Sequence, residues 1–354
     1  MASGRVLVVV ERGSGPGGGP GAGRVEEYLD HVGSHDLGAA RALALSGLAS
    51  GADLVRVIEE LLVPAMAEVG ARWYDGRWNA AQEHVASGIT ENVLSAATVR
   101  ARTRRRPAGA PTAVMACPGG EAHVLPARFA AELLVESGVD VIVLGLPVPV
   151  RDLAAFLTES RPCALILSCT EPLALPGARD AIAAAHRVGV PVLVGGAGFG
   201  PDGRWGRAVG ADAWARRPDE ATAPLRAWRD ESPAFAELGP VDAEVAALHR
   251  LRDSFVDHVL HTLVYRVPAV GRYGGQQVQR AHSDVKLVIA ALSSALLVKD
   301  DRLFTERVAW TRGLPETRRA RAIVLDESLT VIAEELGHGF PGAHRMLAAV
   351  VSHA

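Results

Sequence analysis

The sequence predicts three domains: a four-helix bundle, a doubly wound α/β domain and a C-terminal all-α domain. The chain has 354 residues, which is long enough for more than one hydrophobic core. Apolar residues recur with a helical period before residue 102 and again after residue 241. Between these regions, short continuous apolar runs alternate with helical segments, a pattern typical of buried parallel strands joined by helices.

The domain boundaries follow from composition and period. Residues 11–24 are rich in glycine and proline, so we expect residues 1–24 to be disordered. The bundle is expected over 25–106, with four helices separated by turns near GSHD, ASGAD and YDGRW. The α/β domain is expected over 107–230 and the all-α domain over 241–354, with ESPAFAELGP between them as a linker.

Composition limits the classes of partner. Hydrophobic residues make up 49% of the chain and the net charge is only −3, so neither nucleic acid nor a membrane is expected as a partner. No apolar stretch is expected to span a bilayer. The arginine-rich run at 100–107 is interpreted as a solvated linker, with a nucleic-acid contact as the alternative. The three cysteines, Cys117, Cys163 and Cys169, lack disulfide or zinc spacing, which favours a reducing cytoplasm.

A histidine follows the first of four expected strands, which read TAVMAC, VDVIVLG, CALILSC and VPVLVGG. Ligands of open α/β sheets bind at the carboxyl ends of the strands, so His123 lies where a ligand would bind. Glu121, two residues earlier, could orient the imidazole of a metal-binding histidine. The alternative is an ordinary surface histidine.

Small residues end the third and fourth expected strands, on the edge that carries His123. Ser168 and Thr170 end the third strand, and Gly195 and Gly196 end the fourth. Small residues there leave room for backbone and hydroxyl groups to approach a bulky ligand. A deep channel at this edge of the sheet is therefore predicted.

A second group of candidate residues lies at one end of the helical bundle. Trp73 falls in the last turn of one helix. Glu83 and His84 fall in the early turns of the next helix, which Asn79 and Gln82 open as a capping box. If the two helices are antiparallel, the indole and the Glu-His pair meet at one end of the bundle. The alternative is a core tryptophan beside a solvated helix start.

The α/β part resembles the cobalamin-binding domains, which are Rossmann-like. Its motifs read E-x-H-x-x-P, S-x-T and G-G, where that family has Asp or Glu-x-His-x-x-Gly, Ser-x-(Val/Thr/Leu) and Gly-Gly. The resemblance implies that His123 is the lower axial ligand of cobalt, with Glu121 beside it. It also implies that the remaining motif residues line the channel for the nucleotide tail: Ser168, Thr170, Gly195 and Gly196.

The bundle resembles the helical cap of the light-sensing subgroup of these domains. That cap bears W-x9-E-H, which Trp73, Glu83 and His84 match in type and spacing. By this resemblance the cofactor is adenosylcobalamin, the tryptophan packs on the adenosyl group, and the Glu-His pair contacts the nucleoside. The two resemblances together cover residues 25–225.

Two positions depart from these patterns. Pro126 stands where the family has glycine, so either the backbone accepts a φ of about −65° there or the nucleotide tail enters differently. Tyr74 stands where the light-sensing subgroup has a histidine that binds cobalt after light expels the adenosyl group. His84 or water is the expected replacement.

The C-terminal segment, in DVK…LLVKDDRLFTERVAW, resembles the globin-like or phycobiliprotein-like domain of the photocobilins, which binds biliverdin. A linear tetrapyrrole requires arginines for its propionates, a carboxylate or histidine for its nitrogens, and aromatic walls. Six residues supply these types: Arg272, Tyr273, His282, Asp284, Arg307 and Trp310. Because no cysteine follows Cys169, any bilin in this domain must be held non-covalently. The alternative is a charged helical surface without a ligand.

The expected function is that of a cytoplasmic light sensor rather than an enzyme. The sensor is expected to bind adenosylcobalamin and biliverdin, and to form a homodimer or higher homo-oligomer whose assembly changes with light. It also requires a downstream effector, which the sequence does not identify. Two alternatives remain: a corrinoid protein that carries methyl groups for a methyltransferase system, and a cobalamin sensor with a plain helical partner-binding domain.

Overall fold

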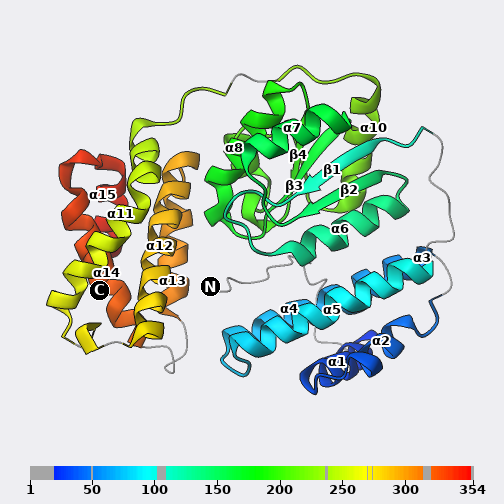
Figure 1. The fold of residues 1–354 in the computed structure, drawn as a ribbon, viewed down its shortest axis with the longest axis horizontal. Helices are drawn as coiled ribbons and strands as arrows, with labels where there is room; N and C mark the ends of the chain where they lie inside the picture. The colour runs from blue at the N-terminus through cyan, green and yellow to red at the C-terminus, as the bar shows by residue number, and fades with distance from the viewer. Residues whose placement is uncertain are drawn as a thin grey trace. The chain divides into compact units, whose positions relative to one another are not determined.

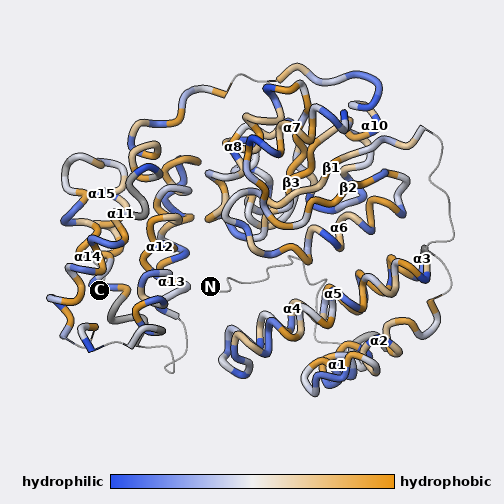
Figure 2. The backbone as a smooth tube through the Cα atoms, viewed as in Figure 1, coloured by the Kyte–Doolittle hydropathy of each residue, from blue (hydrophilic) through white to orange (hydrophobic). Residues whose placement is uncertain are grey.

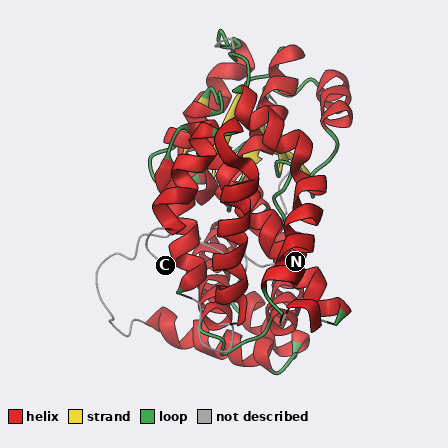
Figure 3. Ribbon diagram, turned by 90° about the vertical axis from the view of Figure 1, so that its left-hand side faces the viewer, coloured by secondary structure: helices red, strands yellow, loops and turns green. Residues whose placement is uncertain are grey.

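The computed structural model describes residues 20–48, 51–101, 109–235, 238–268, 270–272, 274–313 and 320–351. The chain divides into two compact units, and each is described by itself: the first consists of residues 5–171 and 177–236, and the second is mainly 237–354, with which residues 172–176 are grouped. The first unit holds a helical bundle and a parallel sheet, and the second is helical in its described residues (Figure 1). Figure 3 shows that helices predominate over strands in the described residues.

Four helices form the bundle, as predicted from the hydrophobic period. They are α1 (Pro20–Gly33), α2 (Leu37–Leu45), a long helix made of α3 (Gly51–Arg56), η1 (Val57–Leu62) and α4 (Val63–Tyr74), and α5 (Ala80–Ala101). Hydrophobic and hydrophilic residues alternate along these helices, as expected of amphipathic segments (Figure 2). The predicted capping box of α5 is confirmed: the Asn79 amide donates to Gln82 Oε1 at 2.9 Å, and the Gln82 amide donates to Asn79 Oδ1 at 3.0 Å.

The first helix begins earlier than predicted. Disorder was expected through residue 24, but α1 begins at Pro20, while residues 1–19 lie outside the described part of the chain. Proline favours the first position of a helix, because its φ is already helical and its missing N–H would have no partner there. Two glycines of the segment expected to be disordered, Gly21 and Gly23, therefore lie in the first turn of α1.

A π-helical stretch, η1, interrupts the long helix immediately before Pro64. A proline inside an α-helix removes one hydrogen bond and clashes with the carbonyl four residues earlier. The wider π turn moves that carbonyl away, so the helix continues without a break. The buried side chains of this stretch, among them Ile58 and Leu62, still face the core of the bundle.

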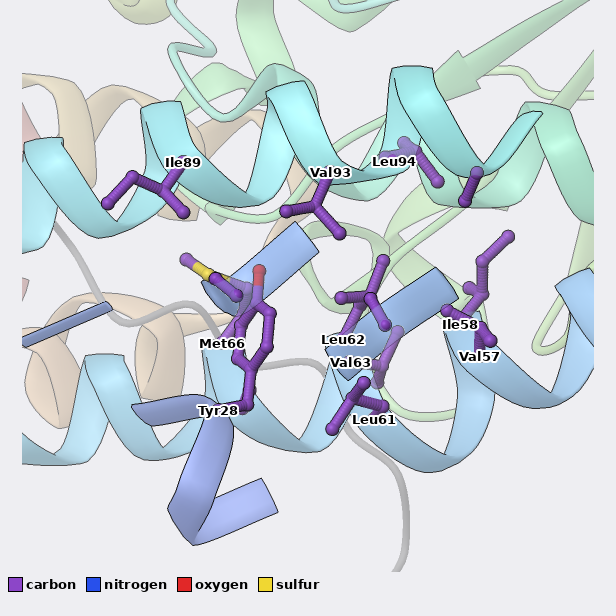
Figure 4. Close-up of a cluster of buried hydrophobic side chains, with 14 of the residues drawn as sticks. Tyr28, Val57, Ile58, Leu61, Leu62, Val63, Met66, Ile89, Val93 and Leu94 are labelled. Atoms are coloured by element: carbon purple, nitrogen blue, oxygen red, sulfur yellow. The ribbon is translucent and has the colours of Figure 1, made fainter. Parts of the chain in front are cut away.

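The bundle core is built from aliphatic side chains around one buried tyrosine (Figure 4). Tyr28 of α1 points toward α5, with Met66 and Val93 beside it. Its hydroxyl donates to Thr90 Oγ1 at 3.1 Å, and burial raises the pKa of Tyr28 to about 12. Both hydroxyl groups are buried, so each is the partner that satisfies the other.

The α/β part contains one parallel sheet with the strand order β2-β1-β3-β4-β5. The strands are β1 (Thr112–Ala116), β2 (Asp140–Gly145), β3 (Ala164–Ser168), β4 (Val192–Gly195) and β5 (Ala213–Ala215). The helices are α6 (Val124–Glu136), α7 (Val150–Ser160), α8 (Leu175–Arg187), α9 (Arg204–Ala208) and α10 (Thr222–Asp230), with the short turns η2 (Pro172–Ala174), η3 (Ala197–Phe199) and η4 (Pro218–Ala221). Residues of α6 and α10 form one core with β1, β3 and β4, while α7 and α8 lie on the other side of the sheet (Figure 1).

The four strands predicted from apolar runs are confirmed, and β5 was missed. This strand has only three residues at the edge of the sheet, so it lacks the continuous apolar run that marked the other four. The strand order reverses between β1 and β3, because the chain leaves β1 toward one edge and continues from β3 toward the other. Loops that leave the carboxyl ends of these two strands flank the crevice in which α/β proteins bind ligands.

The bundle packs on α6, the helix that follows β1. Phe129 of α6 belongs to the bundle core, and α6 contacts both α3 and α5. Arg128 donates to Glu91 Oε1 at 2.6 Å and to Ser95 Oγ at 3.0 Å, both on α5. Because α6 begins directly after His123, the bundle is attached to the segment that carries the candidate ligand.

The sheet end opposite these loops holds the start of the interdomain segment. His186, in the last turn of α8, has its Nε2 2.8 Å from Asp212 Oδ2. The Phe235 ring stacks on the His186 ring, with centroids 4.4 Å apart and planes 4° from parallel. The chain after α10 is therefore held against the α/β part as far as Phe235.

The second unit is built from α11 (Ala243–Arg266), α12 (Gly275–Val298), α13 (Asp301–Arg312), α14 (Ala320–Leu336) and α15 (Pro341–Val351). Helix α12 contacts all four of the others. Glu244 of α11 caps α15, because its carboxylate accepts the backbone N–H groups of Gly342 and Ala343 at 3.1 and 2.6 Å. The predicted helical character is confirmed for the described residues, and the globin-like arrangement stays a prediction.

One helix of the second unit is longer and more apolar than expected from the sequence. Among the described residues, the segment Gln277–Val298 of α12 is long and apolar enough to cross a bilayer by length and composition, although no such stretch was expected. Asp284 and Lys286 interrupt the run and hid it. Half of the apolar window is buried within the protein, and a helix that contacts neighbours on several sides is apolar around most of its circumference.

Replacing Tyr28 by phenylalanine tests the buried hydroxyl pair. The substitution leaves Thr90 Oγ1 buried without its partner, so we expect the free energy of unfolding to fall by about 1–2 kcal/mol. The double variant Tyr28→Phe/Thr90→Val removes both polar groups and should regain part of that loss. Denaturant unfolding measures both values. An unchanged stability in the single variant would contradict the role of the pair.

Candidate functional site

A tight turn carries the candidate histidine away from β1. The Glu121 amide donates to the Pro118 carbonyl at 3.0 Å, which closes a β-turn over residues 118–121. Gly120, its third residue, has a φ of +93°, the conformation of a type II turn that favours glycine. Glu121 is the last residue of this turn, and His123 directly precedes α6.

Glu121 ties two loops together from a buried position, since its side chain is only 1% exposed. One carboxylate oxygen, Oε1, accepts the His123 amide at 2.8 Å and lies 2.5 Å from His123 Nδ1. The other oxygen, Oε2, accepts the amides of Thr170 and Glu171 at 2.5 and 3.0 Å. The loop after β1 and the loop after β3 therefore share one carboxylate.

The charges of Glu121 and His123 determine which nitrogen of the His123 ring is able to bind a metal. Burial opposes the charge on Glu121, but the hydrogen bond and charge of His123, with backbone N–H donors, lower the pKa of the carboxyl group. Burial likewise opposes a charge on His123, but the hydrogen bond and charge of Glu121 raise the pKa of the imidazole. An ionised Glu121 requires a proton on Nδ1, so Nε2 is the nitrogen that can bind a metal when the ring is neutral.

The loop after β4 closes the same edge of the sheet. A Cβ atom at Gly196, whose φ is +101°, would lie 2.3 Å from the Cys169 carbonyl oxygen, so only glycine fits there. The Gly198 amide donates to that carbonyl oxygen at 2.9 Å. Ser168 and Thr170, on either side of Cys169, are buried. The structure thus brings together the predicted residues of all three loops: Glu121, His123, Ser168, Thr170, Gly195 and Gly196.

Proline at position 126 fits the backbone of α6. It is the third residue of the helix, where N–H groups have no intrahelical partner and φ is helical. Of the two explanations offered by the sequence, a backbone that accepts proline is the one that the structure supports.

The predicted residues of the bundle lie at its α4–α5 end. Trp73 is 6% exposed, yet it does not belong to the bundle core cluster in the described part of the chain. Glu83 is 8% exposed, and its carboxylate binds His84 Nδ1 at 2.6 Å and accepts the Ser87 hydroxyl at 3.0 Å. The His84 side chain is 56% exposed, so only the glutamate of the pair is buried.

Glu83 and His123 share one electrostatic environment. The charge of Glu83 is among the causes that raise the pKa of His123, although the two residues are 40 positions apart and belong to the bundle and the α/β part. A charge acts on a titrating group in this way only at short range or through a weakly screened interior. Glu83 is therefore near enough to His123 for its charge to contribute to the raised pKa, after the larger effects of Glu121 and Glu171.

An apolar segment that was not predicted from the sequence lies at the carboxyl edge of the sheet. Leu146 and Val148, in the loop between β2 and α7, are 64% and 36% exposed. They follow the carboxyl end of β2, which pairs with β1. Exposed apolar residues gathered at a ligand-binding edge are typical of a surface that a ligand covers. Their signal in the sequence was an uncharged LPVP directly after a strand.

The described residues among those predicted to bind a bilin lie in the turn before α12, on α12 and on α13. Arg307 lies over the Trp310 ring, 4.6 Å from its centroid, so these two meet on α13. His282 pairs with Asp257 of α11 at 3.4 Å. His282 and Asp284 are two positions apart on α12 and therefore project in different directions. Arg272 is exposed in the turn before α12, and Tyr273 lies outside the described residues.

Two family models match the first unit. Residues 24–98 match a B12 binding domain model, and residues 111–225 match a second model with the same description. The chain is 32% identical over 146 residues to the HTH-type transcriptional repressor CarH of Myxococcus xanthus. This match covers 40% of the chain and 48% of the repressor, so the chain spans about half the length of that relative.

The solved structures that the chain matches include two proteins from microorganisms. The monomethylamine corrinoid protein of Methanosarcina barkeri is 19% identical, with a TM-score of 0.49, over 58% of this chain and 98% of that protein. A cobalamin-binding protein of Desulfitobacterium hafniense is 20% identical, with a TM-score of 0.31, over 58% of this chain and 98% of that protein.

Glu121→Gln tests the carboxylate that joins the two loops. Glutamine has one accepting oxygen, so its amide nitrogen must face backbone N–H donors on one side. We expect the free energy of unfolding of the ligand-free chain to fall by about 2–3 kcal/mol. Glu136→Gln, at the exposed far end of α6, is the control and should change it by less than about 0.5 kcal/mol. Equal stabilities of the two variants would show that Glu121 does not hold the loops.

The donor set of the site suits the ligand that both family models describe. A corrinoid requires one axial nitrogen, and His123 offers Nε2 while Glu121 holds Nδ1. The narrow approach at Gly196 and Cys169, and the buried Ser168 and Thr170, lie on the same edge. Residues 24–98 and 111–225 together therefore form a cobalamin-binding module.

Proposed function

We propose that the chain is a light sensor that binds adenosylcobalamin and signals through a change in its quaternary structure. The observation that carries the proposal is the low exposure of Trp73 and Glu83 at the α4–α5 end of a bundle that packs on α6, the helix that begins directly after His123. The similarity to a transcriptional repressor over 146 residues supports a regulatory role. The proposal includes a downstream effector of unknown identity.

In this proposal, His123 would hold the cobalt of the cofactor through Nε2. Glu121 keeps the proton on Nδ1 and directs Nε2 away from the loop, and the amides of Thr170 and Glu171 keep Glu121 in place. Ser168 and Thr170 contact the nucleotide tail, and Gly195 and Gly196 line its channel. Leu146 and Val148 cover an apolar edge of the corrin.

Trp73, Glu83 and His84 act on the other side. When bound, adenosylcobalamin supplies a cobalt–carbon bond that light cleaves. Trp73 would pack on the adenosyl group, and Glu83 with His84 would contact the nucleoside. Loss of that group would leave a space beside a buried indole, and empty space in a close-packed interior is costly. A shift of the α4–α5 end of the bundle would fill this space and change the surfaces available to a second copy of the chain.

The alternative, a corrinoid protein that carries methyl groups, requires an upper face that opens to partner enzymes. The low exposure of Trp73 and Glu83, at 6% and 8%, favours a shielded upper face and hence the sensor. A chain that takes up methylcobalamin and passes its methyl group to a thiol acceptor would favour the carrier.

Within the same proposal, the second unit holds biliverdin without a covalent bond. Its helical fold and the lack of cysteine after Cys169 support a non-covalent site. The stacked pair of Arg307 and Trp310 combines a cation for a propionate with an aromatic wall. Arg272, Tyr273, His282 and Asp284 complete the proposed set, although helix geometry points His282 and Asp284 in different directions.

The light response is tested by sedimentation of the chain loaded with adenosylcobalamin. We expect different sedimentation coefficients before and after green light, because departure of the adenosyl group lets the bundle rearrange. A sample loaded with hydroxocobalamin in darkness lacks that group and should sediment like the illuminated one. Identical profiles of the dark and illuminated samples would contradict the proposal.

The same preparation tests the tryptophan. Trp73→Ala should bind adenosylcobalamin about tenfold more weakly, a loss of about 1.4 kcal/mol, while hydroxocobalamin binding changes little. Trp228→Ala, on α10, is the matched control and should affect the two cofactors equally. Equal losses for both cofactors in Trp73→Ala would leave the tryptophan without a role at the adenosyl group.

The bilin is tested by expressing the chain with a biliverdin supply. We expect a red or far-red absorption band and, after acid denaturation, pigment that separates from the polypeptide. Arg307→Gln should reduce pigment uptake at least threefold because a propionate loses its charged partner, whereas Arg302→Gln, exposed in the first turn of α13, should not. Pigment that stays attached contradicts the non-covalent site, and a chain without such a band contradicts the bilin altogether.

A further inference from the structure

A backbone contact between two glycines lies beside the candidate ligand. Gly177 is in the first turn of α8, and Gly119 is in the turn between β1 and α6. A Cβ atom placed on Gly177 would lie 2.1 Å from the Gly119 carbonyl oxygen, 2.7 Å from its carbonyl carbon and 2.8 Å from its Cα. All three neighbours are backbone atoms, so no side chain can rotate away to make room.

The contact is not symmetric. A Cβ atom on Gly119 would meet the Gly177 Cα at 3.7 Å, an ordinary van der Waals distance. The difference follows from the turn, whose third residue, Gly120, has a positive φ and so orients the Gly119 carbonyl toward α8. Only the glycine on α8 is therefore required for the two segments to approach this closely.

The turn that meets Gly177 also positions the ligand. Glu121 is two residues after Gly119 and His123 is four residues after it, and both belong to the same short connection before α6. The Glu121 carboxylate fixes the far side of the turn to the amides of Thr170 and Glu171. The turn is thus held between this carboxylate and the first turn of α8, and it cannot move on one side without disturbing the other.

We propose that Gly177 is a positioning residue for the axial ligand: its missing side chain lets the turn over residues 118–121 settle on α8 and so sets the position of His123 Nε2. The proposal rests on the cobalt-binding role of His123 in the proposed function. A Cβ atom on Gly177 needs about 1 Å of additional separation from Gly119 before its contact becomes one that real structures contain. A metal ligand must be held to about 0.5 Å, so a displacement of this size exceeds the tolerance.

The test compares Gly177→Ala with the matched variant Gly119→Ala, which adds the same methyl group from the opposite side of the contact. Both chains are labelled with ¹⁵N-histidine and loaded with cob(II)alamin, and the nitrogen splitting in the electron paramagnetic resonance spectrum is recorded. The label distinguishes a histidine nitrogen from the nitrogen of the cofactor's own base. Thermal unfolding of the ligand-free chains, followed by circular dichroism, is measured beside it.

In Gly177→Ala we expect the ¹⁵N-histidine splitting to be lost from most of the bound cofactor and the affinity for cob(II)alamin to fall about 10–100-fold, as for other groups that orient a metal ligand. Gly119→Ala should keep the splitting and bind within about threefold of the unmodified chain. A purely structural role of Gly177 would lower the unfolding temperature but leave the splitting of the bound fraction unchanged, and that result overturns the proposal. Equal losses in the two variants overturn it as well.

If Gly177→Ala does not fold, Gly120→Ala displaces the same turn through its positive φ without touching α8. An unchanged splitting in Gly120→Ala then overturns the proposal. Failure of the underlying function is seen separately, because an unmodified chain that takes up no cobalamin, or shows no ¹⁵N-histidine splitting, refutes the ligand role of His123 and the positioning role with it.

Discussion

The buried carboxylate of Glu121 is the interaction on which the rest of the site depends. It is the place where the loop after β1, the loop after β3 and the candidate ligand are joined by hydrogen bonds. A charge placed this deep is stable only because it is matched by the imidazole and by several N–H groups at once. The same arrangement decides that His123 presents Nε2, so the fold of two loops and the chemistry of one nitrogen have a common cause.

The attachment of the bundle to α6 gives this arrangement a mechanical consequence. Phe129 and Arg128 anchor the bundle to a helix whose first residue follows His123. Any movement of the bundle relative to the sheet must therefore be accommodated either at the α6 contacts or within α6 itself. Under the proposed function, this attachment joins the bundle to the segment that carries the candidate ligand, so a displacement of one is transmitted to the other.

The parts of this fold that were predictable from sequence are those encoded by local periodicity. Continuous apolar runs predicted four of the strands. Because His123 and Glu121 come directly after the first of these runs, their position in a loop was predictable as well. The strand β5 has only three residues and no such run, so it was not predictable. The π turn before Pro64 relieves a steric clash that exists only once the helix has formed, so the sequence pattern does not reveal it. The contact of Gly177 with Gly119 and the exposure of Leu146 depend on how segments distant in the sequence meet. His282 and Asp284 were grouped because they are close in the sequence, but side chains two positions apart on a helix point in different directions.

The stacking of Phe235 on His186 sets the length of the tether between the two units. Helix α10 ends at Asp230 and α11 begins at Ala243, so a free connection would include twelve residues. With Phe235 held on α8, only seven residues remain before α11, and the greatest distance that the chain can span to Ala243 falls from roughly 45 Å to under about 30 Å. One aromatic pair thereby fixes where the connecting segment leaves the α/β part and how few residues are left to reach α11.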